Sequence, residues 1–160
     1  MKLFLKRDVS DISSRYVVLD EYGKEKYIVT GKITSSKQKL ILSDTQNTKK
    51  SDIILYRFGA TYFLIRYNKR LYALVPCESG KFAFFIYGST LRFLGDISEG
   101  RFSLIDVDKS VVMTQKKCWG NYGTGFELNI YNDEQEILAL SVAICADLYI
   151  SAEDKKAVLT

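Results

Sequence analysis

The sequence predicts a mainly-β protein, a closed antiparallel barrel of about twelve strands that encloses a C-terminal hydrophobic α-helix. Short strand-like runs recur about every eight to twelve residues, a spacing typical of sandwiches and barrels. One later run is apolar on all sides, so it needs an enclosing wall. A single proline and the lack of a Gly/Ser-rich linker favour one domain, residues 1–160.

The strands occupy the first four fifths of the chain. Several alternate apolar and polar residues with period two, which is typical of antiparallel strands that are solvated on one face. In one example Phe126, Leu128 and Ile130 share a face opposite Glu127 and Asn129. The expected strands are Lys2–Lys6, Arg15–Asp20, Lys26–Ile33, Lys39–Ser43, Asp52–Phe58, Thr61–Tyr67, Arg70–Val75, Lys81–Tyr87, Thr90–Leu94, Arg101–Asp106, Ser110–Lys116 and Phe126–Tyr131.

The helix is predicted over about residues 134–150, because Ile137–Ile150 contains only two polar residues, Ser141 and Asp147. Fourteen helical residues rise roughly 21 Å, against about 30 Å of hydrocarbon in a bilayer. We therefore expect protein to surround this helix, with no transmembrane span. Asp133, with Glu136 three residues later, predicts a capping box at its start.

The strand count and the helix predict one architecture. A barrel of about eight strands is filled by its own side chains. A helix about 10 Å across needs a wider barrel, of some eleven or twelve strands. Asp147 would then lie inside or at the mouth of the barrel, where a carboxylate needs a partner. We expect it to pair with an inward Lys or Arg, or with backbone N–H groups, and to close the barrel mouth.

Several segments carry a resemblance to a known family. They are Tyr16–Gly23, Tyr27–Lys32, Phe93–Asp96, Phe102–Asp106, Lys116–Tyr122 and Leu138–Asp147. In this order they resemble the LURP-one-related family, part of the tubby C-terminal-like superfamily, over essentially the whole chain. The resemblance implies a twelve-stranded barrel around a central hydrophobic helix, the same architecture as the strand count predicts.

The resemblance implies less about activity. Tubby proteins bind phosphoinositide headgroups through basic barrel residues, and phospholipid scramblases look similar in fold. The tubby lysine/arginine lipid motif matches no position here, so no ligand residue is carried over. The Pro- and Cys-rich segments and the calcium-binding segment of scramblases are also absent, which makes scramblase-like lipid handling a weaker alternative.

Catalytic chemistry has few candidates. The chain has no histidine, which excludes Ser-His-Asp and Cys-His catalysis and histidine metal sites. Cys77, Cys118 and Cys145 lack metal-ligand spacing and are odd in number, so a disulfide framework is not expected. This favours a reducing compartment, and the N-terminus has no signal-peptide pattern. We expect a cytoplasmic protein that is not an enzyme, with no catalytic residues, cofactor or metal.

Charge predicts an anionic partner. Residues 1–81 hold 16 Lys/Arg and 8 Asp/Glu, a net +8, whereas residues 82–160 hold 7 and 11, a net −4. Basic residues near the aromatic residues Tyr62 and Tyr67 suit lipid headgroups. The candidate residues for binding an anion or a headgroup are Lys49, Lys50, Arg66, Lys69 and Arg70.

Two functions remain open at this point. The first is a domain that binds anionic phospholipid headgroups and is peripheral to the membrane; no nucleic acid is expected. The second is a protein-protein interaction or scaffold domain. It is suggested by residues 62–65 and 82–87, which are apolar on both faces. The basic residues could also simply be solvated strand positions.

A chain that ends at Asn132 is expected not to fold. The run it loses contains seven large aliphatic residues, worth roughly 10–20 kcal/mol together when buried. Whole domains are stable by only about 5–15 kcal/mol. Urea unfolding followed by circular dichroism tests this, and a cooperative native-like transition in the truncated chain would refute it. The seven residues are Ile137, Leu138, Leu140, Val142, Ile144, Leu148 and Ile150.

Overall fold

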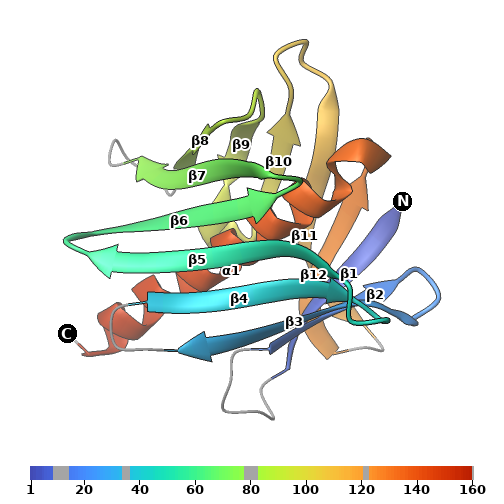
Figure 1. The fold of residues 1–160 in the computed structure, drawn as a ribbon, viewed down its shortest axis with the longest axis horizontal. Coiled ribbons are helices and arrows are strands. Elements are labelled where there is room, and N and C mark those ends of the chain that lie inside the picture. Colours follow the sequence, from blue (N-terminus) through green and yellow to red (C-terminus); the bar gives the residue numbers. More distant parts are fainter. Residues whose placement is uncertain (9–14, 34–36, 78–82, 121–122, 160) are drawn as a thin grey trace.

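The computed structural model is a twelve-stranded antiparallel sheet rolled around one long helix (Figure 1). It describes residues 1–8, 15–33, 37–77, 83–120 and 123–159. The strands are β1 (Lys2–Asp8), β2 (Arg15–Asp20), β3 (Glu25–Ile33), β4 (Lys37–Asp44), β5 (Lys49–Phe58), β6 (Ala60–Tyr67), β7 (Arg70–Cys77), β8 (Ala83–Tyr87), β9 (Arg92–Asp96), β10 (Arg101–Ile105), β11 (Val111–Gly120) and β12 (Gly123–Ile130).

The sheet follows the chain order except at one point. Its strands run β8-β7-β6-β5-β4-β3-β2-β1-β12-β11-β10-β9, so β1 pairs with β12 and joins the two halves. The N-terminal amine of Met1 donates a hydrogen bond to the carbonyl of Ile130 at 2.9 Å. Strands β8 and β9 are the two ends of the sheet, and no ladder joins their described residues. The barrel is therefore nearly closed, with one seam.

The predicted enclosure of the helix is confirmed. Helix α1 (Glu136–Leu159) runs through the barrel (Figure 1). Residues 138–146 are each at most 2% exposed, and more than two full turns of helix are thus covered on every side. Inward residues of the wall, such as Leu40, Ile53 and Phe63, are equally buried and pack into the same core. Within the described part of the chain, no helix is long and apolar enough to cross a membrane.

The predicted helix over about residues 134–150 is confirmed, but its cap and its C-terminal end differ from the prediction. Asn132 is the cap of a 3₁₀ turn, η2 (Asp133–Gln135), because its side chain accepts a hydrogen bond from the Glu134 N–H at 3.1 Å. Glu136 makes no capping box with Asp133; its carboxylate instead accepts hydrogen bonds from two residues of β3. The helix also continues past Ile150 to Leu159, since the following residues include good helix formers and no Gly or Pro.

Some strand boundaries also differ from the predicted ones. The ninth strand was expected at Thr90–Leu94, but β9 begins at Arg92 because residues 88–91 form the connection from β8. A short 3₁₀ turn, η1 (Ile97–Glu99), links β9 to β10, and Asp96 caps it. Lys81 and Phe82, which begin the eighth predicted strand, lie outside the described residues, as do Asn121 and Tyr122 of the family-like segment.

One buried hydrogen bond ties the helix to the wall. The hydroxyl oxygens of Ser51 on β5 and Ser141 on α1 lie 2.8 Å apart. Ser141 donates its proton to the carbonyl of Ile137, one turn earlier, at 2.8 Å. Because a hydroxyl has a single proton, Ser51 must be the donor to Ser141. This satisfies Ser141, the one fully buried polar side chain in the described part of the helix.

At two glycines in the segments that resemble the family, close contacts with neighbouring backbone explain why the residue is glycine. A Cβ on Gly31 would lie 2.9 Å from the carbonyl oxygen of Lys39 on β4 and would overlap the Leu40 side chain. Gly95 has a φ of +119°, and a Cβ there would lie 3.0 Å from the Arg101 carbonyl oxygen on β10. Both positions require a residue without a side chain, because the neighbouring backbone is too close.

Gly31→Ala is expected to destabilise the barrel by about 1–3 kcal/mol, because the added methyl must displace the Lys39 backbone and the buried Leu40. Urea denaturation measures the loss. Thr30→Ala is the matched control, since Thr30 precedes Gly31 on the same strand and is exposed. Equal stabilities for the two variants would contradict the close approach.

Candidate functional site

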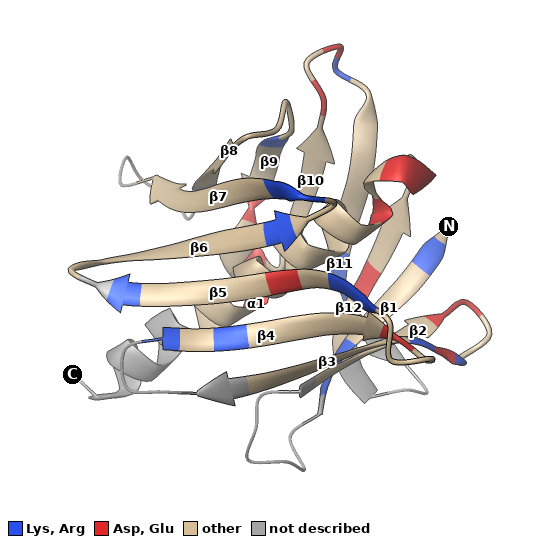
Figure 2. Cartoon of the chain, viewed as in Figure 1, with Lys and Arg blue, Asp and Glu red and all other residues tan. Residues whose placement is uncertain are grey.

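The predicted basic residues gather at one end of three neighbouring strands. Lys49 and Lys50 begin β5, Arg66 lies near the end of β6, and Arg70 begins β7. The register pairs Ser51 with Tyr67, and Tyr67 with Arg70, which brings these strand ends together. Figure 2 shows their blue segments side by side at this end of the barrel. The sequence analysis named these five residues as candidates without placing the two lysines beside the hairpin, and their surroundings in the structure differ.

Lys49 and Lys50 already have acidic partners. The Nζ of Lys49 lies 3.0 Å from Oδ2 of Asp52, and the Nζ of Lys50 lies 3.7 Å from Oδ2 of Asp44. Asp52 is buried, and its other carboxylate oxygen has no hydrogen-bond partner among the described residues. The positive charges of the two lysines are therefore partly offset before any ligand arrives.

Arg66, Lys69 and Arg70 are different. All three are exposed, and none makes an ion pair with a residue that the structure describes. They belong to the β6–β7 hairpin, whose two-residue turn, Asn68-Lys69, has φ values of 53° and 61°. Positive φ at both central residues is the type I′ geometry that suits twisted hairpins. The turn thus places Lys69 at the tip, between the two arginines.

Exposed apolar side chains lie beside Arg66 on the outer face, whereas Arg70, opposite the half-buried Tyr67, is on the other face at the end of its strand. Leu71, the register partner of Arg66, is 56% exposed. Tyr87 on β8, 58% exposed, pairs with Ala73 and is a diagonal neighbour of Leu71 on the outer face. We call Arg66, Lys69, Arg70, Leu71 and Tyr87 the hairpin patch. Sequence reasoning missed Leu71, although its outward strand position beside Arg70 was a usable signal.

The predicted aromatic neighbours were partly wrong. Tyr62 lies four residues before Arg66, about 13 Å along an extended strand. Its ring stacks on Tyr56 with centroids 5.0 Å apart. Tyr67 is half-buried and packs against the core. Neither supplies the exposed aromatic ring of the hairpin patch, which comes from Tyr87.

The sequence predicts a Lys or Arg partner for Asp147, and in the structure this partner is Arg7. The Nη2 of Arg7 on β1 lies 2.9 Å from Oδ2 of Asp147 and 2.8 Å from the hydroxyl of Ser151. The hydroxyl of Tyr16 on β2 donates to the same Oδ2 at 2.6 Å. Burial, and then the Asp147 carboxylate, raise the pKa of Tyr16 well above its ordinary value, so this hydroxyl keeps its proton. The contacts of Asp147 with Arg7 and Tyr16 hold the helix against β1 and β2.

A second ion pair lies at the start of the helix. The carboxylate of Glu136 accepts from the Nζ of Lys26 at 2.7 Å and from the hydroxyl of Tyr27 at 3.0 Å. Burial, and then Glu136, raise the pKa of Tyr27. The Glu136 carboxylate and the Tyr27 hydroxyl are therefore hydrogen-bonded within the fold, and these contacts hold the start of the helix against β3.

The other polar residues that the sequence analysis considered have local roles. Burial raises the pKa of Cys145, which is fully enclosed in the helix as a small apolar side chain. Asp106 and Asp108 accept backbone hydrogen bonds from Val107 and Ser110 within their own turn. Among the described residues, no three His, Cys, Asp or Glu side chains gather in a metal-binding arrangement.

Comparisons with known proteins point to one family. A family model described as LURP-one-related matches residues 1–147, which include the hairpin patch, Arg7 and Asp147. An uncharacterised protein of Bacillus subtilis (strain 168), YxjI, is 21% identical over 164 residues, covering 99% of each chain. No solved structure gives a significant match.

Asp147→Asn is expected to cost about 1.5–3 kcal/mol, the usual worth of hydrogen bonds to a charged group. It removes the carboxylate that holds Arg7 and Tyr16. Urea unfolding of Asp147→Asn, Tyr16→Phe and the double variant gives the coupling between the two residues. Glu99→Gln, on the exposed surface of η1, is the control. Unchanged stability in Asp147→Asn would refute the tie.

Proposed function

This chain belongs to the LURP-one-related family, and from that premise we propose that it is a non-enzymatic binding domain. It docks on membranes that carry anionic phospholipid headgroups, and the hairpin patch makes the contact. The single observation that carries the proposal is the combination of three exposed cations, unpaired among the described residues, with an exposed leucine and tyrosine beside them.

The energetics support reversible docking. A basic side chain near an anionic leaflet contributes about 1 kcal/mol, so Arg66, Lys69 and Arg70 together contribute about 3 kcal/mol. Leu71, which is 56% exposed, adds about 1–1.5 kcal/mol if its remaining exposed area leaves water. Tyr87 has the amphipathic character of side chains that favour the membrane interface. These sums support a peripheral protein that binds and leaves, on the cytoplasmic side in our proposal.

Lys49 and Lys50 have a secondary role in this proposal. Their ammonium groups are engaged by Asp52 and Asp44, so an arriving phosphate competes with carboxylates that are already in place. They add to the local positive potential but do not form the main contact. No described residue makes an ion pair with the three hairpin cations, although Arg66 lies opposite Asp52 in the register of β5 and β6.

A protein-protein interaction domain is the second candidate. Phe85 and Leu94 are 54% and 59% exposed on the outer faces of β8 and β9, away from the hairpin tip. Exposed apolar side chains that gather on one face are typical of interaction surfaces. Protein binding through these residues would not depend on Lys69, which separates the two candidates experimentally.

Lys69→Glu is expected to abolish most binding to anionic vesicles, because it replaces an attraction at the hairpin tip by a repulsion. Co-sedimentation with phosphatidylcholine vesicles, with and without phosphatidylserine, measures the binding at several salt concentrations. Wild-type binding should require phosphatidylserine and fall as salt rises, since exposed charges are screened beyond about 10 Å at 0.1 M salt.

Lys109→Glu is the matched control for this experiment. Lys109 is also an exposed lysine in a turn, and its φ of 67° resembles the 61° of Lys69, but it connects β10 to β11. It should bind like the wild type. Leu71→Ser should weaken binding without changing its salt dependence. Binding that ignores salt, or that Lys109→Glu reduces as strongly as Lys69→Glu, would defeat the proposal.

A further inference from the structure

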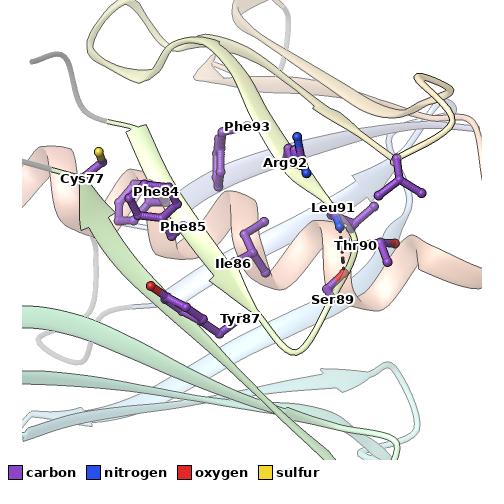
Figure 3. Close-up of a pocket in the computed structure, with 11 residues that line it drawn as sticks. Cys77, Phe84, Phe85, Ile86, Tyr87, Ser89, Thr90, Leu91, Arg92 and Phe93 are labelled. Atoms are coloured by element: carbon purple, nitrogen blue, oxygen red, sulfur yellow. Dashed lines mark hydrogen bonds between the residues drawn. The ribbon is translucent and has the colours of Figure 1, made fainter. Parts of the chain in front are cut away.

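A cavity of about 500 Å³, the seam cavity, lies beside the contact between β8 and β9 (Figure 3). Its lining comes from β8, from the connection between the two strands, from the start of β9, and from Cys77 and Val107 at its borders. The cavity is open to solvent, because Phe85, Tyr87 and Arg92 on its lining are exposed. Its volume lies within the usual range of about 300–1,000 Å³ for ligand sites.

Aromatic rings close the inner side of the seam cavity. The rings of Phe84 on β8 and Phe93 on β9 have their centroids 5.4 Å apart, so the two strands meet through these side chains. Phe84 also contacts the ring of Tyr149 on α1 at 5.1 Å, and Phe93 contacts Phe102 on β10 at 5.0 Å. A ligand can therefore rest against the rings from the solvent side and leave both the strand contact and the helix in place.

The two ends of the seam cavity differ in polarity. Cys77 and Phe84 lie at the end where the last residues of β7 pair with the first residues of β8. Ser89, Thr90 and Arg92 lie at the other end, where the chain turns from β8 into β9. Figure 3 shows this separation along β8, a strand of five residues that rises about 13 Å. The cavity therefore suits an elongated amphiphile with its polar group at the turn.

The polar end offers two hydrogen-bond donors. Arg92 is the only charged side chain among the described lining residues, and it makes no ion pair with any described residue. In the same turn the hydroxyl of Ser89 accepts from the Leu91 N–H at 3.2 Å, and no described residue accepts its own proton. Thr90 is already engaged, because it donates its hydroxyl proton to Asp106 at 2.6 Å. A ligand thus meets one guanidinium and one hydroxyl.

These donors favour a carboxylate. A guanidinium fits the two oxygens of a carboxylate with two parallel hydrogen bonds. One arginine also balances the single charge of a carboxylate. A phosphate monoester carries about −1.5 to −2 at pH 7 and would keep an unbalanced charge beside apolar side chains. The rest of the lining is mainly apolar and aromatic, and it stabilises a hydrocarbon chain by removing each methylene from water.

We infer that the seam cavity binds an unbranched fatty acid as its carboxylate. The carboxylate pairs with Arg92 and accepts the hydroxyl proton of Ser89, and the acyl chain lies along β8 against Phe84 and Phe93. This function goes beyond membrane docking and does not require it, since the ligand is a dissolved acid and Lys69 takes no part in the site.

Calorimetric titration of the full-length protein tests the site, with decanoate kept below its micelle-forming concentration and with no vesicles present. Decanoate should bind at one saturable site. Decanamide, which has the same shape but no charge, should bind about fivefold more weakly, the upper range for an exposed ion pair. Octanoate, which is two methylenes shorter, should bind about tenfold more weakly than decanoate, because less apolar surface leaves water.

Arg92→Gln should bind decanoate about fivefold more weakly than the wild type and should no longer distinguish it from decanamide. Arg101→Gln is the matched control, since Arg101 is also an exposed arginine, on β10, but does not line the cavity. Lys69→Glu separates this site from membrane docking, because it changes the hairpin patch only. Both of these variants should bind decanoate like the wild type, even if vesicle binding proves absent.

The place of binding is checked by NMR of the same protein. Decanoate should shift the amide signals of β8, of the connection to β9 and of β9 itself, and should leave those of β3 and β4 unchanged. The absence of saturable binding, equal affinities of the wild type for decanoate and decanamide, or shifts confined to residues away from β8 and β9 would overturn the site. So would an Arg101→Gln variant that loses as much affinity as Arg92→Gln.

Discussion

The structure depends on a helix that is apolar around its whole circumference, and a wall must therefore surround it on every side. This requirement sets the number of strands, because a barrel of about eight would leave no room. It also explains why β1 returns to pair with β12, since a sheet that stopped at β1 would leave one side of α1 in water. The N-terminus is thereby fixed in the wall, with Met1 hydrogen-bonded to Ile130.

Apolar contacts enclose the helix, but polar contacts set its position. Glu136 contacts β3, Ser141 contacts β5, and Asp147 contacts β1 and β2. At 100° per residue, Glu136 and Asp147 project within about 20° of each other, whereas Ser141 projects about 140° away. The first and third contacts therefore fix one face against β1–β3, and the second fixes the opposite side. An apolar helix in an apolar tube could otherwise slide or turn at little cost.

Much of this fold could be predicted from local sequence. Strand-like runs at regular spacing located twelve strands, and the apolar run located the enclosed helix. The partner of Asp147 could be predicted only as a residue type, because the choice of Arg7 depends on how β1 meets the C-terminal part of the helix. The cap at Asn132 was missed, since Glu136 is held by Lys26 and Tyr27, which are distant in sequence. The continuation to Leu159 was missed because the prediction followed only the apolar run.

The candidate site, like the fold, could be predicted from the sequence only in part. That Arg66, Lys69 and Arg70 share one hairpin could be predicted from the sequence, whereas the nearness of Lys49 and Lys50 depends on the pairing of β5 with β6. That Lys49 and Lys50 are already paired depends on where Asp44 and Asp52 point. The β8–β9 seam had no sequence signal, because hydrogen bonding between consecutive strands is the ordinary expectation. In the structure β8 and β9 share no ladder of hydrogen bonds. They meet instead through their side chains, with the rings of Phe84 and Phe93 5.4 Å apart.

The hairpin patch and the seam share one side of the barrel wall. Tyr87 belongs to both, since it is exposed beside Leu71 and also lines the seam cavity. A membrane against the hairpin would therefore also cover one border of the seam cavity. Lys69 at the hairpin and Arg92 at the seam belong to different elements of the fold. A substitution can therefore change the charge of either place without changing the charge of the other.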